Sequence, residues 1–128
     1  MNIKLLITIL ILLPTLAKAT PPNNLLLNYD VELQKLDITA NHPSERLERH
    51  FIRRVVVTKN SKDTQEFYFV RQVTPGQFKA TLDYKTEPGD HLDVKLSCMQ
   101  GGSAEVSLDI PKSEDIKTQI VPSKSKVL

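Results

Sequence analysis

Three side chains of this sequence could together hold a transition metal. His42 and His50 flank a short charged loop in the stretch NHPSERLERHF, and Cys98 is the only cysteine of the chain. Two imidazoles and a thiolate suit a borderline-soft metal such as iron, copper or zinc. Met99 or Gln100, which follow the cysteine directly, could supply a fourth ligand if the chain turns there. We therefore predict a mononuclear metal site, provided that the fold brings His42, His50 and Cys98 together.

Each of the three residues also has a purely structural interpretation. Cys98 continues the alternation of the apolar residues before it, and such a cysteine is commonly a small buried hydrophobe. His42 precedes a proline, which forces extended geometry on it, so its role could be limited to shaping a loop. His50 could pack at the end of a strand. Because Cys98 has no partner within the chain, it could also form a disulfide with another chain and make an oligomer.

The third histidine, His91, does not join this set. It precedes Cys98 by seven residues on one expected strand, and an odd separation places the two side chains on opposite faces. At about 3.3 Å per residue the two also lie roughly 20 Å apart along the strand. We expect His91 to be a surface residue beside Asp93.

Alternation of apolar and polar residues is the dominant pattern, and its period of two predicts strands. Tyr29–Thr39 reads as one strand or a pair, with a phase slip at Gln34 and Lys35. The other expected strands are Phe51–Asn60, Gln65–Val73, Gln77–Lys85, His91–Cys98 and a last one that includes Ala104–Ile110. About seven short strands separated by turn signals favour an all-β fold, an immunoglobulin-like β-sandwich.

The loop that follows Cys98 has a constraint of its own. A two-residue Gly101-Gly102 hairpin would set Cys98 opposite Glu105, and directly opposed residues share a face of the sheet. An apolar face would then meet a polar one, so the loop must have an odd length or contain a bulge. The two glycines can supply the positive φ angles that such a loop needs.

The first nineteen residues have the organisation of a secretory signal peptide. Lys4 provides a positive charge, Leu5–Leu13 is predominantly apolar, Pro14 interrupts the run, and the triplet AKA fits a small-x-small cleavage site. The apolar run is too short to span a bilayer, which needs roughly 20 residues. We expect export to the periplasm or the extracellular space, no membrane span, one domain over 20–111 and a loose polar tail over 112–128.

The charge balance argues against nucleic acid as a partner. Removal of residues 1–19 takes Lys4 and Lys18 from the 17 basic side chains and leaves 15, against 15 acidic ones. Affinity for nucleic acid comes mainly from clustered Lys and Arg, and this chain is neutral, has few aromatic residues and contains no Trp. The four arginines between residues 46 and 54 form a local cluster, but glutamates interrupt it, and we interpret it as a solvated face.

The stretches NHP and RHFIRRVVV, a Pro-Gly turn, and a last hairpin that opens with SC and closes with Gly resemble the iron-binding domain of the superoxide reductases. This desulfoferrodoxin and neelaredoxin family is similar to the chain over Tyr29–Ile110. The resemblance implies an immunoglobulin-like sandwich with one iron bound by four histidine nitrogens and an axial cysteine sulfur. It also implies reduction of superoxide to hydrogen peroxide, with electrons from a donor protein.

The resemblance places the family's His-Pro motif on His42, its His-aromatic-Ile motif on His50 and its cysteine on Cys98. The histidine of the family's Cys-x-x-His-Gly loop falls on Gly101, and the upstream Glu-Lys-His-x-Pro element has no counterpart. The segment between His42 and His50 is also two residues longer than is usual in the family. Three of five ligands match, which leaves a second interpretation open: a non-catalytic binding or carrier module that has lost the metal.

Overall fold

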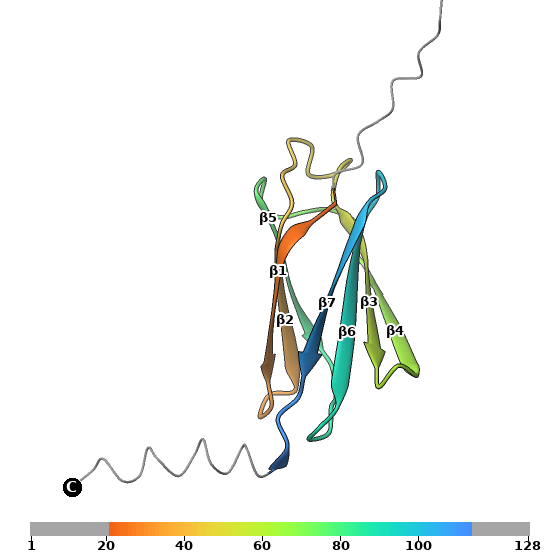
Figure 1. The fold of residues 1–128 in the computed structure, drawn as a ribbon. Coiled ribbons are helices and arrows are strands. Elements are labelled where there is room, and N and C mark those ends of the chain that lie inside the picture. The colour runs from red at the N-terminus through yellow and green to blue at the C-terminus, as the bar shows by residue number, and fades with distance from the viewer. Residues whose placement is uncertain (1–20, 114–128) are drawn as a thin grey trace, which may run out of the picture.

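The computed structural model describes residues 21–113, which form seven β-strands in two antiparallel sheets (Figure 1). The expected signal peptide over 1–19 lies outside the described residues, as does the tail beyond residue 113. The strands are β1 (Asn23–Asp30), β2 (Lys35–Asn41), β3 (Ile52–Lys59), β4 (Asp63–Tyr68), β5 (Gln77–Asp83), β6 (His91–Cys98) and β7 (Ser103–Asp109).

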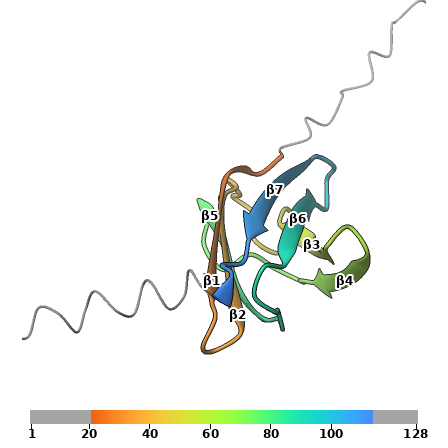
Figure 2. The ribbon, with the colours of Figure 1, turned by 60° about the horizontal axis from the view of Figure 1, so that its bottom comes forward.

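The two sheets lie face to face as the layers of a β-sandwich (Figures 1 and 2). One has the strand order β1-β2-β5 and the other β4-β3-β6-β7. The predicted all-β sandwich of about seven strands is therefore confirmed. In constant-type immunoglobulin domains the fourth strand joins the sheet of the first two, whereas here β4 pairs with β3. The immunoglobulin type stays a prediction.

The core lies between the sheets and follows the alternation of the sequence. In β6, Leu92, Val94, Leu96 and Cys98 all face inward, and the first three are completely buried. The opposing layer contributes alternate residues of β2 and β5. Because β2, β5 and β6 turn every second residue inward, the apolar pattern fixes which face of each sheet is inside.

The first strand begins earlier than the sequence pattern indicated. Tyr29–Thr39 is indeed a pair of strands, with its turn just before Lys35, but β1 extends back to Asn23. The run Leu25 to Leu27 hides this strand because it does not alternate. A register shift between Asn23 and Leu26 accommodates it, and Leu26 is left largely exposed.

The fourth strand ends earlier than expected. The predicted strand over Gln65–Val73 is observed only as far as Tyr68, and the remainder belongs to the loop that leads to β5. In this loop Val70 and Val73 are exposed while Gln72 is buried, the reverse of what their polarities suggest. The buried glutamine has hydrogen-bond partners that only the tertiary structure supplies.

No helix within residues 21–113 has the length and apolar character needed to cross a membrane.

The hairpin between β6 and β7 has the predicted odd length. Ser97 pairs with Ser103, and the amide of Cys98, the last residue of β6, donates to the carbonyl oxygen of Gly102 over 3.0 Å. Three residues, from Met99 to Gly101, therefore form the loop. Gly101 and Gly102 have φ angles of 99° and 86°, in the region that favours glycine. A Cβ at Gly102 would also lie 2.9 Å from the backbone nitrogen of Pro21. The start of the described chain therefore packs tightly on this hairpin.

Replacement of Gly102 by alanine should destabilise the fold. The substitution Gly102→Ala forces a side chain into the left-handed region and against the Pro21 backbone, and we expect the free energy of unfolding to fall by about 1–3 kcal/mol. Gly76→Ala is the matched control, because a Cβ at Gly76 meets nothing within 4 Å. Urea denaturation of the two variants measures the difference. Equal stabilities would contradict the packing described here.

Candidate metal centre

His42 follows the last residue of β2 and is held in place by backbone hydrogen bonds to the β4–β5 loop. Its amide donates to the carbonyl oxygen of Gly76 over 3.1 Å, and the amide of Ser44 donates to the carbonyl oxygen of Pro75 over 2.6 Å. These bonds extend the pairing of β2 with β5 by two residues beyond the strand. The histidine side chain consequently points into the end of the sandwich, where it is completely buried.

The loop from His42 to His50 closes on itself. The amide of His50 donates to the carbonyl oxygen of Arg46 over 2.7 Å. At the loop's two ends, the Ser44 hydroxyl donates to the carbonyl oxygen of His50. These bonds set the two imidazole rings edge to face, with their centroids 4.7 Å apart and their planes at 66°.

Strand pairing brings Cys98 to the same place. Ile52, two residues after His50, is the register partner of Cys98, and the amide of Met99 donates to the carbonyl oxygen of Phe51 over 3.0 Å. A β-bulge between Ile52 and Arg54 shifts the register at this point. The entry to β3 and the exit of β6 therefore lie side by side.

His42, His50 and Cys98 meet at one end of the sandwich, which is the condition that the predicted metal site requires. One ligand atom of each, a ring nitrogen or the sulfur, lies within 4.8 Å of those of the other two. Two ligands of one tetrahedral ion are about 3.3–3.6 Å apart, given bonds of roughly 2.0–2.3 Å. Closing the remaining gap needs a movement of about an ångström, which the half-buried His50 ring can supply. Binding of a metal itself stays a prediction.

The buried Gln72 fixes the tautomer of His42. Both protons of its amide nitrogen are used: Nε2 donates to the carbonyl oxygens of His42 and Thr74, each over 2.8 Å. Since those acceptors are backbone oxygens, the orientation of the amide is determined, and Oε1 faces His42 Nδ1 at 2.7 Å. An amide oxygen can only accept, so Nδ1 carries the proton and donates it to Gln72.

The other nitrogen of His42 has the properties of a metal ligand. With the proton on Nδ1, Nε2 has a free lone pair, and this buried atom has no hydrogen-bond partner in the described part of the chain. A buried polar atom without a partner is costly. Histidines that bind metals typically donate their second ring N–H to a protein acceptor, as His42 does to Gln72. The donor set therefore fits a transition metal of the kind that the sequence predicts.

The electrostatics of His50 also favour a ligand. Its surroundings lower the pKa of the imidazole from its ordinary value, chiefly through burial and secondarily through the neighbouring His42. The lowered pKa keeps His50 neutral over more of the pH range. A neutral imidazole is the form that binds a metal.

Two surface pockets flank the site. One, of about 420 Å³, is lined by His50 and Gln100 among others. The other, of about 340 Å³, is lined by Cys98, Met99 and the side chains of Arg53, Arg54 and Tyr68. Small solutes can therefore approach from two sides. Gln100 and Met99, the residues predicted as a fourth ligand, each line one of these pockets, and their role as ligands stays a prediction.

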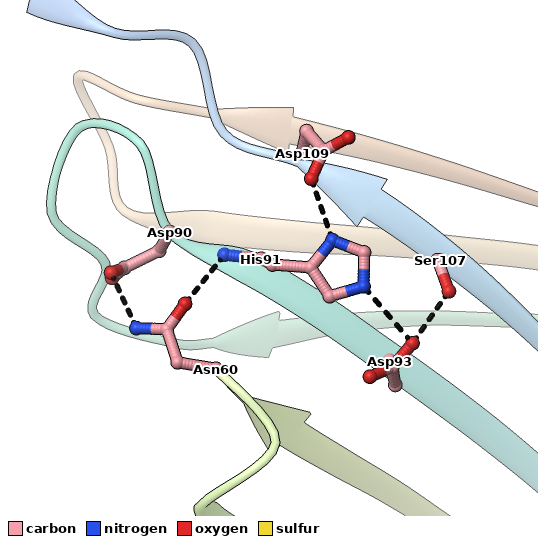
Figure 3. A network of polar contacts seen from close by, with 6 residues as sticks. All are labelled: Asn60, Asp90, His91, Asp93, Ser107 and Asp109. Carbon is pink, nitrogen blue, oxygen red and sulfur yellow. Dashed lines mark hydrogen bonds and ion pairs between the residues drawn. The ribbon is translucent and has the colours of Figure 1, made fainter.

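His91 lies outside the cluster of His42, His50 and Cys98, as the strand geometry predicted, and Figure 3 shows its own partners. Its Nδ1 is 2.6 Å from Asp109 Oδ1 and its Nε2 is 3.2 Å from Asp93 Oδ1. Both ring nitrogens thus face carboxylates, an arrangement that suits the protonated imidazolium. The hydrogen bond to Asp109, followed by that to Asp93, raises the pKa of His91. This histidine connects β6 to β7 through its hydrogen bond to Asp109. As an imidazolium it has no lone pair that could bind a metal.

Gln72 is the residue of the site that sequence reasoning missed. It stands in the stretch FVRQVTPG, where Val70 and Val73 make the segment resemble a continuation of the strand before it. Only the proline and glycine that follow signal a loop. The partner of Gln72 lies 30 positions earlier in the chain, so no local pattern could reveal it.

Searches against protein-family models, curated proteins and solved structures find no match for this chain. The assignment of a function consequently depends on the geometry of the site.

The tautomer of His42 can be measured directly. We expect long-range proton–nitrogen NMR of the metal-free protein to show the proton of the His42 ring on Nδ1. Gln72→Leu removes the acceptor, so the preference for Nδ1 should be lost and the free energy of unfolding should fall by about 2–4 kcal/mol, since buried polar groups lose their partners. A proton on Nε2 in the unaltered protein would contradict the hydrogen-bond assignment.

His91 should give a pH-dependent contribution to stability. Its pKa is higher in the folded state than the ordinary 6.5, so the stabilisation is complete below about pH 6 and is lost as the pH rises through the folded-state pKa. We expect the stability difference between the unaltered protein and His91→Gln to shrink from about pH 5.5 to about pH 8.5. Denaturant titrations across this range measure it, and a difference independent of pH would contradict the assignment.

Proposed function

We propose that this chain is a mononuclear metal protein whose site consists of His42, His50 and Cys98. The proposal rests on the buried Nε2 atom of His42. Gln72 holds the ring proton on Nδ1, so Nε2 has a free lone pair, and this atom has no hydrogen-bond partner in the described residues. The neighbouring imidazole and thiol, with ligand atoms within 4.8 Å, complete a set of soft and borderline donors. The resemblance to superoxide reductases favours iron, and copper or zinc would also suit the donors.

We further propose that the protein reduces superoxide. A bound iron ion would supply the electron that, together with two protons, converts superoxide into hydrogen peroxide, and an electron-donor protein would replace it. Each of the three residues would have its own role in this reaction. His42, fixed by Gln72, anchors the metal in the interior, and Cys98 provides a thiolate that makes the metal electron-rich. His50 lies at the solvent boundary, beside a pocket large enough for a small substrate.

A non-catalytic binding or carrier module is the alternative. The small number of ligands favours this alternative. Three donors match, out of the five of the superoxide reductase family, and no other His, Cys, Asp or Glu of the described residues joins the cluster. A β-sandwich alone does not determine function. Metal content together with turnover of superoxide separates the two functions.

The proposal includes the place where the protein works. The signal-like segment over 1–19 supports export to the periplasm or the extracellular space. Cys98 is a buried free thiol among the described residues, 6% exposed, which favours metal binding over a disulfide with another chain.

Metal analysis of the purified protein tests the site. We expect about one metal ion per chain, and a loss of affinity of at least about 100-fold in Cys98→Ser and in His50→Gln, since a lost ligand should cost more than the 10–100-fold of a lost outer partner. His91→Gln is the matched control, because it removes a histidine outside the site. With iron, a thiolate charge-transfer band should be present in the unaltered protein and absent from Cys98→Ser.

Three results would contradict the proposal or a part of it. Equal metal content in His50→Gln, Cys98→Ser and the unaltered protein would place any metal elsewhere. A folded protein that takes up no iron, copper or zinc would favour the module. A loaded protein that does not convert superoxide into hydrogen peroxide would retain the metal site and exclude the reductase.

A further inference from the structure

All five arginines of the chain line pockets at the end of the sandwich that holds the candidate metal centre. The loops of this end are at the top of Figure 1. The arginines line three neighbouring pockets, from which lysine is absent. The lysines of the described residues are spread over other parts of the strands and turns. The positions are Arg46 and Arg49 in the loop before β3, Arg53 and Arg54 at its start, and Arg71 in the β4–β5 loop.

Three of these arginines line a single pocket. It has a volume of about 490 Å³ and is formed by Arg46, Leu47, Glu48, Arg49 and Arg71. Two segments that are distant in the sequence build it, and one backbone hydrogen bond joins them: the amide of Gln72 donates to the carbonyl oxygen of Leu47 over 2.9 Å. The fold therefore holds together the two segments that carry the three arginines.

The charges in this pocket are not compensated by ion pairs. Among residues 21–113, the only ion pair of an arginine joins Arg54 to Glu66, over 3.6 Å and outside this pocket. Glu48 offsets one of the three positive charges and leaves an excess of two. Like charges held close together repel, and a bound anion relieves this repulsion. Guanidinium groups offer forked donors that match the oxygens of phosphate and carboxylate groups.

We propose that the pocket of Arg46, Arg49 and Arg71 is a binding site for a doubly charged oxyanion, of which a phosphate group is the model. The excess charge of the pocket matches that of the ligand, and three planar donors can surround a tetrahedral group. Arg71 is the decisive side chain because it is the one arginine of this pocket that comes from the second loop. The site lies beside the metal centre, since Arg46 lines both this pocket and that of His50.

NMR titration of the isotope-labelled protein at constant ionic strength tests this site. Inorganic phosphate, phosphoserine and acetate are the three probes. We expect saturable shifts of the backbone amides from Leu47 to Arg49 and of Arg71 and Gln72. Phosphate should bind at least about tenfold more tightly than acetate, which carries one charge. A higher affinity for phosphoserine would identify the source as an organic phosphate, and a higher affinity for inorganic phosphate would identify a free oxyanion.

Two variants that lose the same positive charge distinguish binding in this pocket from non-specific electrostatic attraction of phosphate to the protein. Arg71→Gln should weaken phosphate binding at least about tenfold, the loss expected for charge-assisted hydrogen bonds. Lys79→Gln removes the same charge from an exposed position on β5 and should leave the affinity unchanged. Arg71→Lys keeps the charge without the forked donors and should bind with intermediate affinity.

Three results would overturn the proposal: no saturation, shifts distributed over the lysines, or equal weakening by Arg71→Gln and Lys79→Gln. The test is independent of the metal centre, because Cys98→Ala should bind phosphate like the unaltered protein. Failure of the oxyanion site and failure of the proposed metal site therefore give different results.

Discussion

The hydrogen bond between His42 Nδ1 and Gln72 Oε1 is the interaction on which the candidate site depends. An imidazole can be buried at low cost only if both nitrogens are satisfied. Gln72 satisfies one nitrogen and, through its own two donated bonds, is itself satisfied. The other nitrogen is left as a buried lone pair beside a second imidazole and a thiol. An ordinary structural histidine needs no such neighbours, and a metal ligand does.

The fold positions these groups through features of its backbone. Pairing of β2 with β5 continues past Asn41 into His42. The register of β3 against β6 sets Cys98 beside the chain that leaves His50, and the bulge after Ile52 lets both Ile52 and Val55 face the core although three positions separate them. The loop between the histidines then needs only to return the chain from one sheet to the other. Secondary structure thus determines the site more than loop conformation does.

Much of this fold could be predicted from the sequence, because in a half-buried strand every second residue is apolar and faces the core. The inward face of β6 and the odd length of its hairpin with β7 both followed from that periodicity. The rule failed at Leu25 to Leu27, where periodicity is absent, and at Val70 to Val73, where two valines suggest a strand although both are exposed. The convergence of His42, His50 and Cys98 was expected from a family resemblance. Gln72 was not expected, since a buried polar residue is recognised only by its partner.

The order in which the chain can acquire a metal follows from the origin of the donors. His42 and His50 belong to one loop, but the sulfur comes from the sixth strand and the supporting amide from another loop. In the unfolded chain only the two imidazoles are close to each other in sequence, and two such ligands bind a metal weakly. A complete coordination sphere arises only after both sheets have closed. In this protein a cation would therefore bind after the fold has formed. It would stabilise the folded state and would not direct folding.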